Sequence, residues 1–224
     1  MNKAPVGVLG GTFDPVHNGH LRLAMEMAIA LGMDHVRLVP CARPPHRNAP
    51  TASPGQRAKW IRVAVSIEPR LRLDDRELLR SGPSYTVDTL ASMRTEMPDT
   101  PLCLIMGRDV FAHLPKWHQW ERLFDSAHIV LIDRPDIQTE LHPEAEKTLA
   151  SRAVDDVRHL HDELSGHIYS YAPPPLAISA SRIRDLLGAG ESPRYLLPTA
   201  VLDDIMDAGV YMPSKPQPAT AANQ

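Results

Sequence analysis

The sequence contains little cysteine and no long apolar run. Its 224 residues include only two cysteines, Cys41 and Cys103, too few for a disulfide framework or a four-cysteine zinc site. No apolar stretch approaches the ~18 residues of a membrane span. The first residues, MNKAPVGVLGG, also lack the apolar core of a signal peptide. We therefore expect a cytoplasmic protein that does not act in a membrane.

An excess of positive charge is also missing. The formal net charge is −3, and this balance supplies no broad basic surface of the kind that binds nucleic acid. The hydrophobic share of 43% and the charged share of 23% are ordinary for a globular protein. A small phosphate site remains compatible with this composition, because it needs only a few cationic groups.

Proline is abundant, and it separates the chain into segments. The 22 prolines cluster around residues 40–54, 173–175 and 213–218, which marks these stretches as loops or tail. Elsewhere, short apolar runs alternate with segments of helical periodicity. Strands are expected at 6–9, 36–39, 71–73, 102–106, 129–132 and 167–171, and helices at 21–29, 56–67 and 86–97.

This alternation of strand and helix predicts an α/β fold with a parallel sheet and right-handed crossovers. Such a sheet binds its ligand at the carboxyl ends of the strands. Residues 136–166 are polar and weakly patterned, and we interpret them as a variable helical excursion. We expect a single domain over residues 1–212 and a disordered tail over 213–224.

The most specific signal is GGTFDPVHNGH at residues 10–20, between the first strand and the first helix. The paired glycines allow a sharp turn and a close approach of a ligand to the backbone. The helix start that follows offers unpaired N–H groups and the positive end of a dipole, which suit a polyphosphate. His17 and His20 are three residues apart, so both lie on one face and can donate hydrogen bonds to phosphoryl oxygens.

Other interpretations of this motif stay open on the residues alone. A glycine-rich turn is weak evidence by itself, and this one matches neither G-x-G-x-x-G nor the Walker pattern. The two histidines are also compatible with a zinc site, but third and fourth ligands are not evident, so we predict no metal ligands. His17 can also be a packing residue.

A second motif, ISASRIRDLL, occupies residues 178–187. Ser179 or Ser181 can cap a helix there, and Ile183, Leu186 and Leu187 give that helix a buried face. The alternative is a capped surface helix with two solvated arginines.

Two further segments carry polar groups next to expected elements. PPHR at residues 44–47 forms a stiff loop that can present His46 and Arg47 to a ligand, or remain a solvated loop. In ELLRSGPSYTVDTL, at residues 77–90, Ser84 or Thr86 can cap the helix that follows.

The last segments follow buried strands. MGRD ends one strand, where Gly107 allows a ligand to approach the backbone and Asp109 can accept hydrogen bonds from ribose hydroxyls. In LPKWHQW, at residues 114–120, Trp117 offers a flat face for a pyridine ring, whereas we expect Trp120 in the core. Arg134, in the sequence DRP, ends another strand.

Taken together and in this order, these motifs resemble those of the nucleotidyltransferase superfamily, and GGTFDPVHNGH is similar to the bacterial nicotinate-nucleotide adenylyltransferases in particular. The matches extend from Val6 to about Val210, except for residues 136–166. The resemblance implies a Rossmann-like parallel sheet with helices on both faces and a small helical C-terminal part. It also implies transfer of AMP from ATP to nicotinic acid mononucleotide, which gives nicotinic acid adenine dinucleotide and pyrophosphate in NAD biosynthesis.

The resemblance implies three groups of site residues. The catalytic residues are His17, His20 and Arg184. The residues that bind ATP are Gly10, Gly11, Thr12, Phe13, Gly107, Asp109, Ser179 and Ser181. The residues that bind the mononucleotide are His46, Arg47, Ser84, Tyr85, Thr86, Trp117 and Arg134. Ser181 stands where the family usually has threonine, and it keeps the hydroxyl.

The reaction implied needs little covalent chemistry from the protein. The mononucleotide's 5′-phosphate has a second pKa near ~6, so it is largely ionised at neutral pH and needs no general base. The site must bring two anions together and neutralise the departing pyrophosphate. Carboxylates are sparse in the motifs, so we expect Mg²⁺ to be held mainly by the ATP phosphates. A homo-oligomer stays open.

Three rival functions remain to be weighed. Another transferase of the superfamily would act on the amidated mononucleotide or on phosphopantetheine, and the Ser-Tyr-Thr and Lys-Trp segments argue against it. A class I aminoacyl-tRNA synthetase needs a further lysine-rich loop and a far longer chain. A nucleotide-sensing module without turnover is the third, and an assay of the purified protein would distinguish it.

Overall fold

A computed structural model describes residues 3–42, 49–133, 139–174 and 176–212. Its centre is a seven-stranded sheet in the order β3-β2-β1-β4-β5-β7-β6, with every neighbouring pair parallel. The strands are β1 (Val6–Gly11), β2 (His35–Pro40), β3 (Leu71–Leu73), β4 (Leu102–Gly107), β5 (His128–Ile132), β6 (Ala153–Val154) and β7 (Ile168–Tyr171). The predicted parallel sheet is therefore confirmed.

The central strands are apolar throughout because both faces of the sheet are covered. Successive side chains of a strand point to opposite faces. In β4, Cys103 and Ile105 face one hydrophobic core and Leu104 faces the other, and in β5 Val130 and Leu131 divide in the same way. Burial on both faces explains the near-continuous apolar runs in the sequence.

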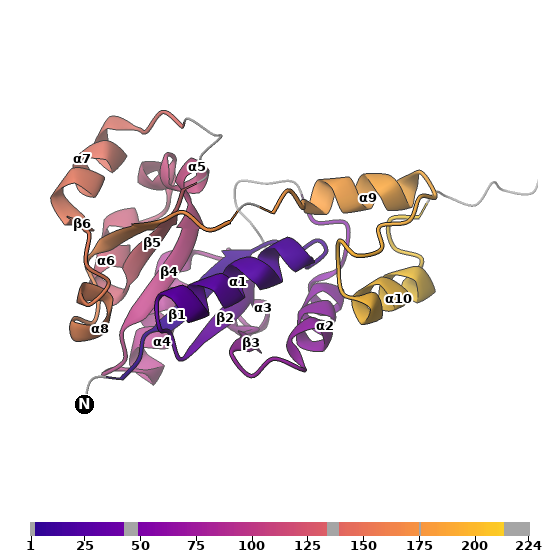
Figure 1. Cartoon of the computed structure of the whole chain (residues 1–224), viewed down its shortest axis with the longest axis horizontal. Coiled ribbons are helices and arrows are strands. Elements are labelled where there is room, and N and C mark those ends of the chain that lie inside the picture. The colour runs from indigo at the N-terminus through magenta and orange to yellow at the C-terminus, as the bar shows by residue number, and fades with distance from the viewer. Residues whose placement is uncertain (1–2, 43–48, 134–138, 175, 213–224) are drawn as a thin grey trace, which may run out of the picture.

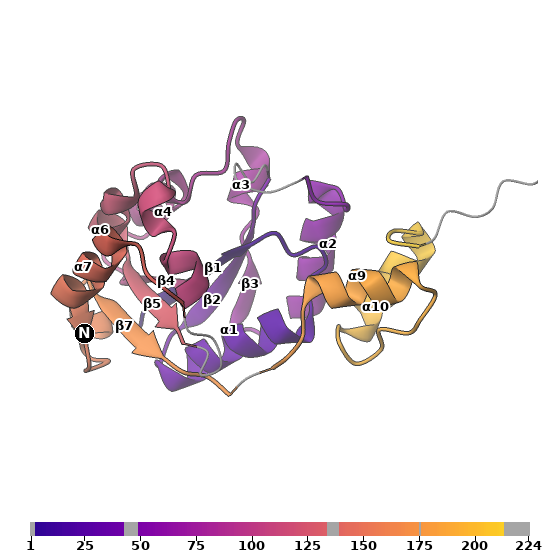
Figure 2. The ribbon, with the colours of Figure 1, turned by 90° about the horizontal axis from the view of Figure 1, so that it is seen from above.

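Two groups of helices cover these faces. One core includes residues of α1 (Asn18–Ala30), α2 (Pro54–Val65), α8 (His159–Asp162), α9 (Ala180–Gly188) and α10 (Thr199–Ala208). The other includes residues of α4 (Thr86–Glu96), α5 (Arg108–Phe111), α6 (Leu123–Ser126) and α7 (Pro143–Arg152). Figures 1 and 2 show α9 and α10 beside α2, at one end of the molecule. Helices on both faces and a helical C-terminal part are both confirmed.

Helix α2 starts earlier than its periodicity predicts, because its start is defined by a cap. Ser53 and Gln56 form a reciprocal capping box, and Pro54 occupies the first turn. Trp60 of this helix is fully buried, and its indole N–H donates to Asp204 of α10 at 2.8 Å. The expectation that Trp120 lies in the core is wrong, since this side chain is only half-buried.

The strand order reverses between β1 and β4. From β1 the chain builds β2 and β3 outward on one side, then returns to build β4 and β5 on the other. A parallel sheet binds its ligand where the strand order reverses in this way, at the carboxyl ends of the strands. Leu9 pairs with Ile105, so Gly11 and Gly107, two residues further on, lie level at that edge.

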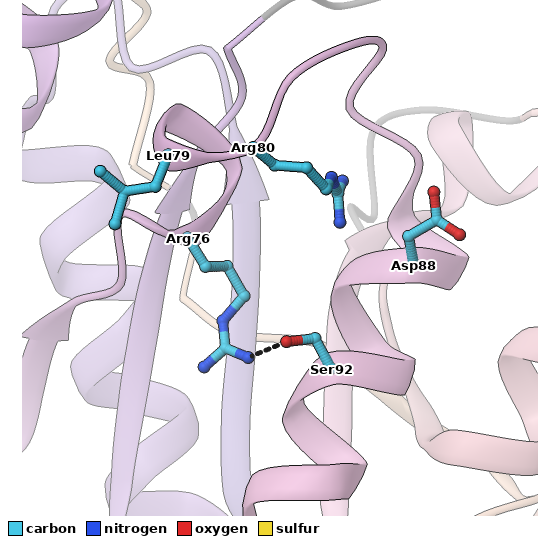
Figure 3. A pocket seen from close by; sticks show the side chains of 5 residues that line it. All are labelled: Arg76, Leu79, Arg80, Asp88 and Ser92. Atoms are coloured by element: carbon cyan, nitrogen blue, oxygen red, sulfur yellow. Dashed lines mark hydrogen bonds between the residues drawn. The ribbon is translucent and has the colours of Figure 1, made fainter.

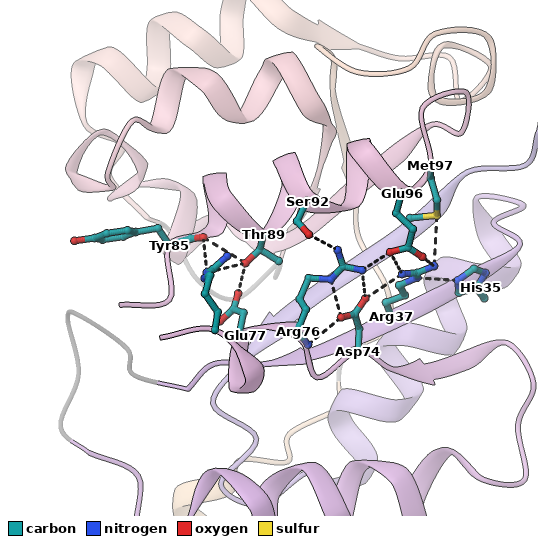
Figure 4. Close-up of polar contacts among 11 residues, drawn as sticks. His35, Arg37, Asp74, Arg76, Glu77, Tyr85, Thr89, Ser92, Glu96 and Met97 are labelled. Carbon is teal, nitrogen blue, oxygen red and sulfur yellow. Dashed lines mark hydrogen bonds and ion pairs between the residues drawn. The ribbon is translucent and has the colours of Figure 1, made fainter. Parts of the chain in front are cut away.

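An ion-pair network fixes α4 against the β2–β3 side of the sheet (Figure 4). Arg37 of β2 contacts Asp74 at 3.0 Å and Glu96 of α4 at 2.9 Å, and Arg76 contacts the same carboxylates at 2.8 and 2.6 Å. Burial by itself would raise the pKa of Asp74, but hydrogen bonds from Arg76 and Arg37 outweigh it and lower the pKa. Arg76 begins the short helix α3 (Arg76–Leu79).

The excursion before β7 is helical, as expected, but it also contains a strand. Helices α7 and α8 lie within it, and Ala153–Val154 forms the edge strand β6, which pairs with β7. Two residues are too short to leave a periodic signal, so the sequence could not reveal this strand. Among the described residues, no helix combines the length and the apolar character that crossing a membrane would require. The expected tail at 213–224 lies outside the described residues.

Candidate active site

The loop between β1 and α1 begins with extended backbone. β1 continues through Gly10 and Gly11, which pair with the end of β2. The chain turns instead at Phe13, where φ is 52°, and the Asp14–Pro15 peptide bond is cis. The prediction that the glycine pair makes the turn is therefore wrong. A Cβ added to Gly10 would meet no atom within 4 Å, so the backbone there is open to a ligand.

His17 and His20 lie against each other at the start of α1, as predicted. Their rings stack with centroids 3.6 Å apart, and the edge of Phe13 meets His20 at 4.9 Å. His17 is the N-cap residue, and its Nδ1 accepts a hydrogen bond from the His20 N–H at 3.4 Å. A neutral His17 must then carry its proton on Nε2, which can donate to a ligand.

Both histidines are neutral at pH 7. Burial lowers the pKa of His17 to about 4, and burial together with the neighbouring His17 lowers the pKa of His20 to about 3. His20 Nδ1 is enclosed and has no hydrogen-bond partner among the described residues. An unsatisfied buried polar atom at this position is what a missing ligand would leave. The pair thus offers neutral N–H donors rather than fixed positive charges.

The C-terminal motif meets this loop in space. Ser179 is the N-cap residue of α9 and accepts from the Arg182 N–H at 3.2 Å, which confirms one of the two predicted caps. A Cβ on Gly19 would lie 3.3 Å from Ile178 Cβ, so the residues before α9 pack against the start of α1. The structure therefore brings the two most distant motifs together.

Arg184 makes the polar link between the two motifs. Its Nη1 donates to the carbonyl oxygen of Asp14 at 2.7 Å, and its Nη2 donates to Ser181 Oγ at 3.3 Å. The guanidinium is half-buried, whereas Arg182 is exposed. Arg184 therefore brings a permanent positive charge to the loop that carries the histidine pair, whereas the Arg182 side chain is exposed.

Asp14 holds the loop from inside. Its carboxylate accepts hydrogen bonds from the backbone N–H groups of Thr51 and Ala52, both at 3.0 Å, and from the Tyr211 hydroxyl at 2.5 Å. Asp14 is buried. It lies within the first motif, but its position there does not distinguish a supporting role from a binding role. Tyr211 lies after α10, and nothing in the sequence indicates its contact with Asp14.

Arg57 of α2 satisfies the backbone of the same loop. This side chain is fully buried and donates to the carbonyl oxygens of Thr12 at 2.6 Å, Cys41 at 2.8 Å and Ala52 at 3.3 Å. Three carbonyl oxygens thus share one planar donor group. One feature of the sequence could have indicated this role. Arg57 lies four residues before Ile61, on the apolar face of an amphipathic helix.

The start of α4 brings the mononucleotide-binding candidates together. Ser84 Oγ accepts from the Ala42 N–H at 3.1 Å, which joins this segment to the end of β2. Helix α4 begins at Thr86, with Tyr85 as N-cap residue and no side-chain cap. The prediction that Ser84 or Thr86 caps the helix is therefore wrong.

Glu77 and Arg80 both form hydrogen bonds to the first turn of α4, and Figure 4 shows Glu77 beside Thr89. Glu77 is buried and accepts from Thr89 Oγ1 at 2.7 Å. Arg80 donates to the Tyr85 carbonyl oxygen at 3.4 Å. Burial raises the pKa of Glu77, although hydrogen bonds from Thr89 and Ser84 oppose that rise. Both residues belong to the 77–90 motif, but neither was predicted as a site residue.

Aromatic side chains complete this side of the site. The ring of His118 lies 4.4 Å from that of Tyr85, tilted by 31°. Trp117 follows the 3₁₀ helix η1 (Leu114–Lys116) and is half-buried against the core. A second 3₁₀ helix, η2 (Trp120–Arg122), follows. His118 is not among the predicted site residues, and its contact with Tyr85 adds it to this side of the site.

Gly107 and Asp109 mark the end of β4. The Asp109 carboxylate lies over Gly107, where a side chain would collide with it. Arg108, between them, pairs with Asp133 at 2.5 Å across the neighbouring strand end. The exposed Asp109 therefore lies at the carboxyl end of β4, and its predicted contact with ribose hydroxyls stays a prediction. His46, Arg47 and Arg134 lie outside the described residues.

A separate open pocket of about 400 Å³ lies between α3 and α4 (Figure 3). It contains none of the predicted site residues; its lining is Arg76, Leu79, Arg80, Asp88 and Ser92. Arg76 is already paired with Asp74 and Glu96. The residues that can bind phosphate lie instead at the carboxyl ends of β1 and β4, which is where we place the active site.

Comparison with known proteins agrees with this geometry. Residues 8–186 match the family model described as cytidylyltransferase-like. The chain is 47% identical over 211 residues to a probable nicotinate-nucleotide adenylyltransferase of Aeromonas salmonicida, which covers 94% of this chain and 99% of the relative. A counterpart in Pseudomonas syringae pv. tomato is 48% identical over 207 residues, which covers 92% of this chain and 93% of the relative.

A solved structure shares the fold at low sequence identity. The nicotinic acid mononucleotide adenylyltransferase of Plasmodium falciparum, complexed with NaAD, superposes with a TM-score of 0.69. Its sequence is 17% identical, and the match covers 93% of this chain and 97% of that one.

The buried histidine pair should make stability depend on pH. The pKa values of about 4 and 3 lie below the ordinary 6.5, so between these values the unfolded chain binds protons that the native state does not. The free energy of unfolding should fall as pH drops through this window, by up to about 1.4 kcal/mol per pH unit for each such group. Urea unfolding at several pH values would measure this slope.

The variant His20→Gln removes one titrating group, so its slope should be shallower by up to about 1.4 kcal/mol per pH unit. His113→Gln is the matched control, because His113 is exposed, and it should keep the original slope. Equal slopes for the two variants would contradict a buried, neutral His20.

The Tyr211 hydroxyl should contribute to stability through Asp14. Tyr211→Phe leaves a buried carboxylate oxygen without one of its donors, which we expect to lower the free energy of unfolding by about 1–3 kcal/mol. Tyr195→Phe is the control, since Tyr195 is 89% exposed. Urea denaturation should show little change in the control, and an unchanged Tyr211→Phe would refute the supporting role.

Proposed function

Because the chain belongs to the nicotinate-nucleotide adenylyltransferases of the cytidylyltransferase-like family, we propose that it transfers AMP from ATP to nicotinic acid mononucleotide. The products are nicotinic acid adenine dinucleotide and pyrophosphate. One observation carries the proposal: the stacked His17–His20 pair lies at the start of α1, and Arg184 reaches the same loop from α9. That is an arrangement of donors suited to a polyphosphate.

The chemical step is an in-line displacement. An oxygen of the mononucleotide's 5′-phosphate forms a bond to the α-phosphorus of ATP, while the bond from that phosphorus to the bridging oxygen of pyrophosphate breaks. Negative charge accumulates on the departing pyrophosphate. His17 and His20 donate hydrogen bonds to it, and Arg184 supplies a full positive charge. The N–H groups at the start of α1 add a partial positive charge.

The low pKa values of the histidines are consistent with this mechanism. A group whose pKa lies near 3 or 4 is a poor proton acceptor at neutral pH. The mononucleotide phosphate is already ionised, so the step needs no general base. Histidines used as neutral donors therefore serve the reaction, whereas histidines used as bases would not.

The residues at the site fit a Mg²⁺ ion that is carried by ATP. The Asp14 carboxylate accepts three hydrogen bonds from the protein and offers little to a cation. Asp109 is the exposed carboxylate at the end of β4. We therefore propose that ATP phosphate oxygens and water molecules supply most of the ligands of the ion. When bound, the ion would neutralise phosphate charge.

The start of α4 supports recognition of the nicotinate carboxylate. No side chain caps this helix among the described residues, so its first N–H groups are available to a ligand. An anion is stabilised at such a position by the helix dipole. We assign Ser84, Tyr85 and Thr86 to the carboxylate, with Trp117 and His118 near the pyridine ring.

ATP is made and used in the cytoplasm, where we propose that the enzyme acts.

The acid should be the preferred mononucleotide. The nicotinate carboxylate and the nicotinamide group have nearly the same shape, so packing cannot separate them. The amide would point its NH₂ group at N–H donors, and an unmet polar pairing costs about 1–3 kcal/mol. We expect a preference of roughly ten- to a hundredfold in kcat/KM, since ~1.4 kcal/mol is tenfold. Pyrophosphate release with ATP and each mononucleotide would measure it.

Two outcomes of that assay would contradict the proposal at different levels. Equal efficiency with both mononucleotides would remove the substrate assignment and leave only nucleotidyl transfer. Absence of turnover with either one would favour a nucleotide-sensing protein.

The two arginines of α9 provide a matched pair. Arg184 contacts the histidine loop, whereas Arg182 is exposed and donates only its backbone N–H, to Ser179. Arg184→Ala should lower kcat/KM for ATP by about 10²–10³, the loss seen when one preorganised donor is removed. Arg182→Ala should stay within about twofold. Equal losses would mean that the phosphate-binding arginine has been misassigned.

A further inference from the structure

A cluster of two histidines and a glutamate lies between α8 and β7, at the edge of the sheet where β7 begins. It consists of His159, Glu163 and His167, and one ligand atom from each lies within 4.8 Å of the other two. His159 Nδ1 lies 3.4 Å, and His167 Nε2 2.8 Å, from the same oxygen, Glu163 Oε1. We propose that this histidine–glutamate cluster binds a divalent transition-metal ion, with zinc as the best match.

The donor set indicates the class of metal. Two imidazole nitrogens and one carboxylate oxygen form a three-ligand set that zinc adopts in proteins, with water in the fourth position. Bonds of about 2.0–2.2 Å in a tetrahedral arrangement separate ligand atoms by roughly 3.3–3.6 Å. The 3.4 Å separation between His159 and Glu163 lies in that range. The 2.8 Å separation between His167 and Glu163 is a hydrogen-bond distance, which would lengthen when an ion binds. Mg²⁺ and Ca²⁺ prefer oxygen ligands and match the cluster poorly.

The buried His128 holds two of the three ligands in place. It is fully buried in β5, and its Nδ1 accepts from the backbone N–H of His167 at 3.2 Å. Its Nε2 therefore carries the proton and donates to the carbonyl oxygen of Glu163 at 2.9 Å. One neutral imidazole thus fixes the backbone at both Glu163 and His167. Supporting hydrogen bonds of this kind orient the ligands of metal sites.

The segment from Glu163 to His167 is also tied to the sheet. The Gly166 N–H donates to the Ala127 carbonyl oxygen at 3.2 Å, and the His167 carbonyl oxygen accepts from Ile129 at 2.8 Å. Gly166 has a φ of 104°, which glycine adopts without strain. His159 lies four residues before Glu163, on the short helix α8, and its side chain is 46% exposed. This exposure leaves the His159 side chain free to adjust when the ion binds.

Two arginines reach the same loop without competing for the carboxylate. Arg94 donates to the Leu164 carbonyl oxygen at 2.8 Å, and Arg152 donates to the Gly166 carbonyl oxygen at 3.0 Å. The Glu163 side chain is 53% exposed, so solvent can fill the remaining coordination positions. His167 directly precedes β7, so the cluster lies at the amino ends of the parallel strands, where Figure 1 shows α8. The proposed active site lies at the carboxyl ends of the strands, so the cluster and the active site are at opposite ends of the strands.

Zinc titration of the full chain, freed of metal with a chelator and kept without ATP, tests the proposal. Calorimetry should show binding of Zn²⁺ that is at least about tenfold weaker in His159→Ala and in Glu163→Ala. Zn²⁺ should also raise the Tm of the unaltered protein more than that of either variant, because an ion that binds only the native state stabilises it. Both altered side chains are exposed, and retained adenylyl transfer would verify that the variants fold.

His113→Ala is the control, since it removes an exposed histidine elsewhere and should leave Zn²⁺ affinity unchanged. If His159→Ala and Glu163→Ala bind Zn²⁺ as tightly as the unaltered protein, the ion binds elsewhere and the proposal is wrong. If Zn²⁺ neither binds nor raises the Tm, the cluster is a set of hydrogen bonds only. Neither result bears on adenylyl transfer, which is assayed separately.

Discussion

The structure depends on satisfying the polar groups of the β1–α1 loop. This loop lies buried at the centre of the proposed site, so its carbonyl oxygens and the Asp14 carboxylate need protein partners. Arg57 comes from α2, Arg184 from α9 and Tyr211 from the residue stretch after α10. Segments separated by more than a hundred residues thus meet on a few atoms. The C-terminal helices are therefore part of the support of the phosphate site.

The same burial determines the electrostatics of the site. Taking the histidine pair out of water favours the uncharged imidazoles, and the hydrogen bond into His17 Nδ1 selects the tautomer with a proton on Nε2. In the function that we propose, polyphosphate binding depends on neutral donors, one arginine and the dipole of α1. Such a site does not hold several positive charges close together in the absence of a ligand. Charges held in that way would repel one another, and their burial would cost desolvation free energy.

Periodicity in the sequence was sufficient to predict the sheet, its main strands and the helices α1, α2, α4 and α9, because both faces of the sheet bury apolar residues. It also placed the two histidines and Ser179 correctly, since spacing and capping are local. The supporting residues were not predictable. Arg57 looks like any helix arginine, and nothing marks Tyr211 as a partner of Asp14, 197 positions away. Trp120 and the two-residue β6 were missed because their burial and pairing are set by tertiary contacts.

Helix α4 differs from most of the other long helices at its start. His17, Ser53, His142 and Ser179 cap α1, α2, α7 and α9 with their side chains. Helix α4 has no such cap, although Ser84 lies two residues before it. Ser84 instead accepts a hydrogen bond from Ala42, at the end of β2. A serine used to join two loops leaves the helix N–H groups unsatisfied, at a cost of about 1 kcal/mol. A ligand carboxylate at this position would recover that energy, and a neutral amide would recover less of it.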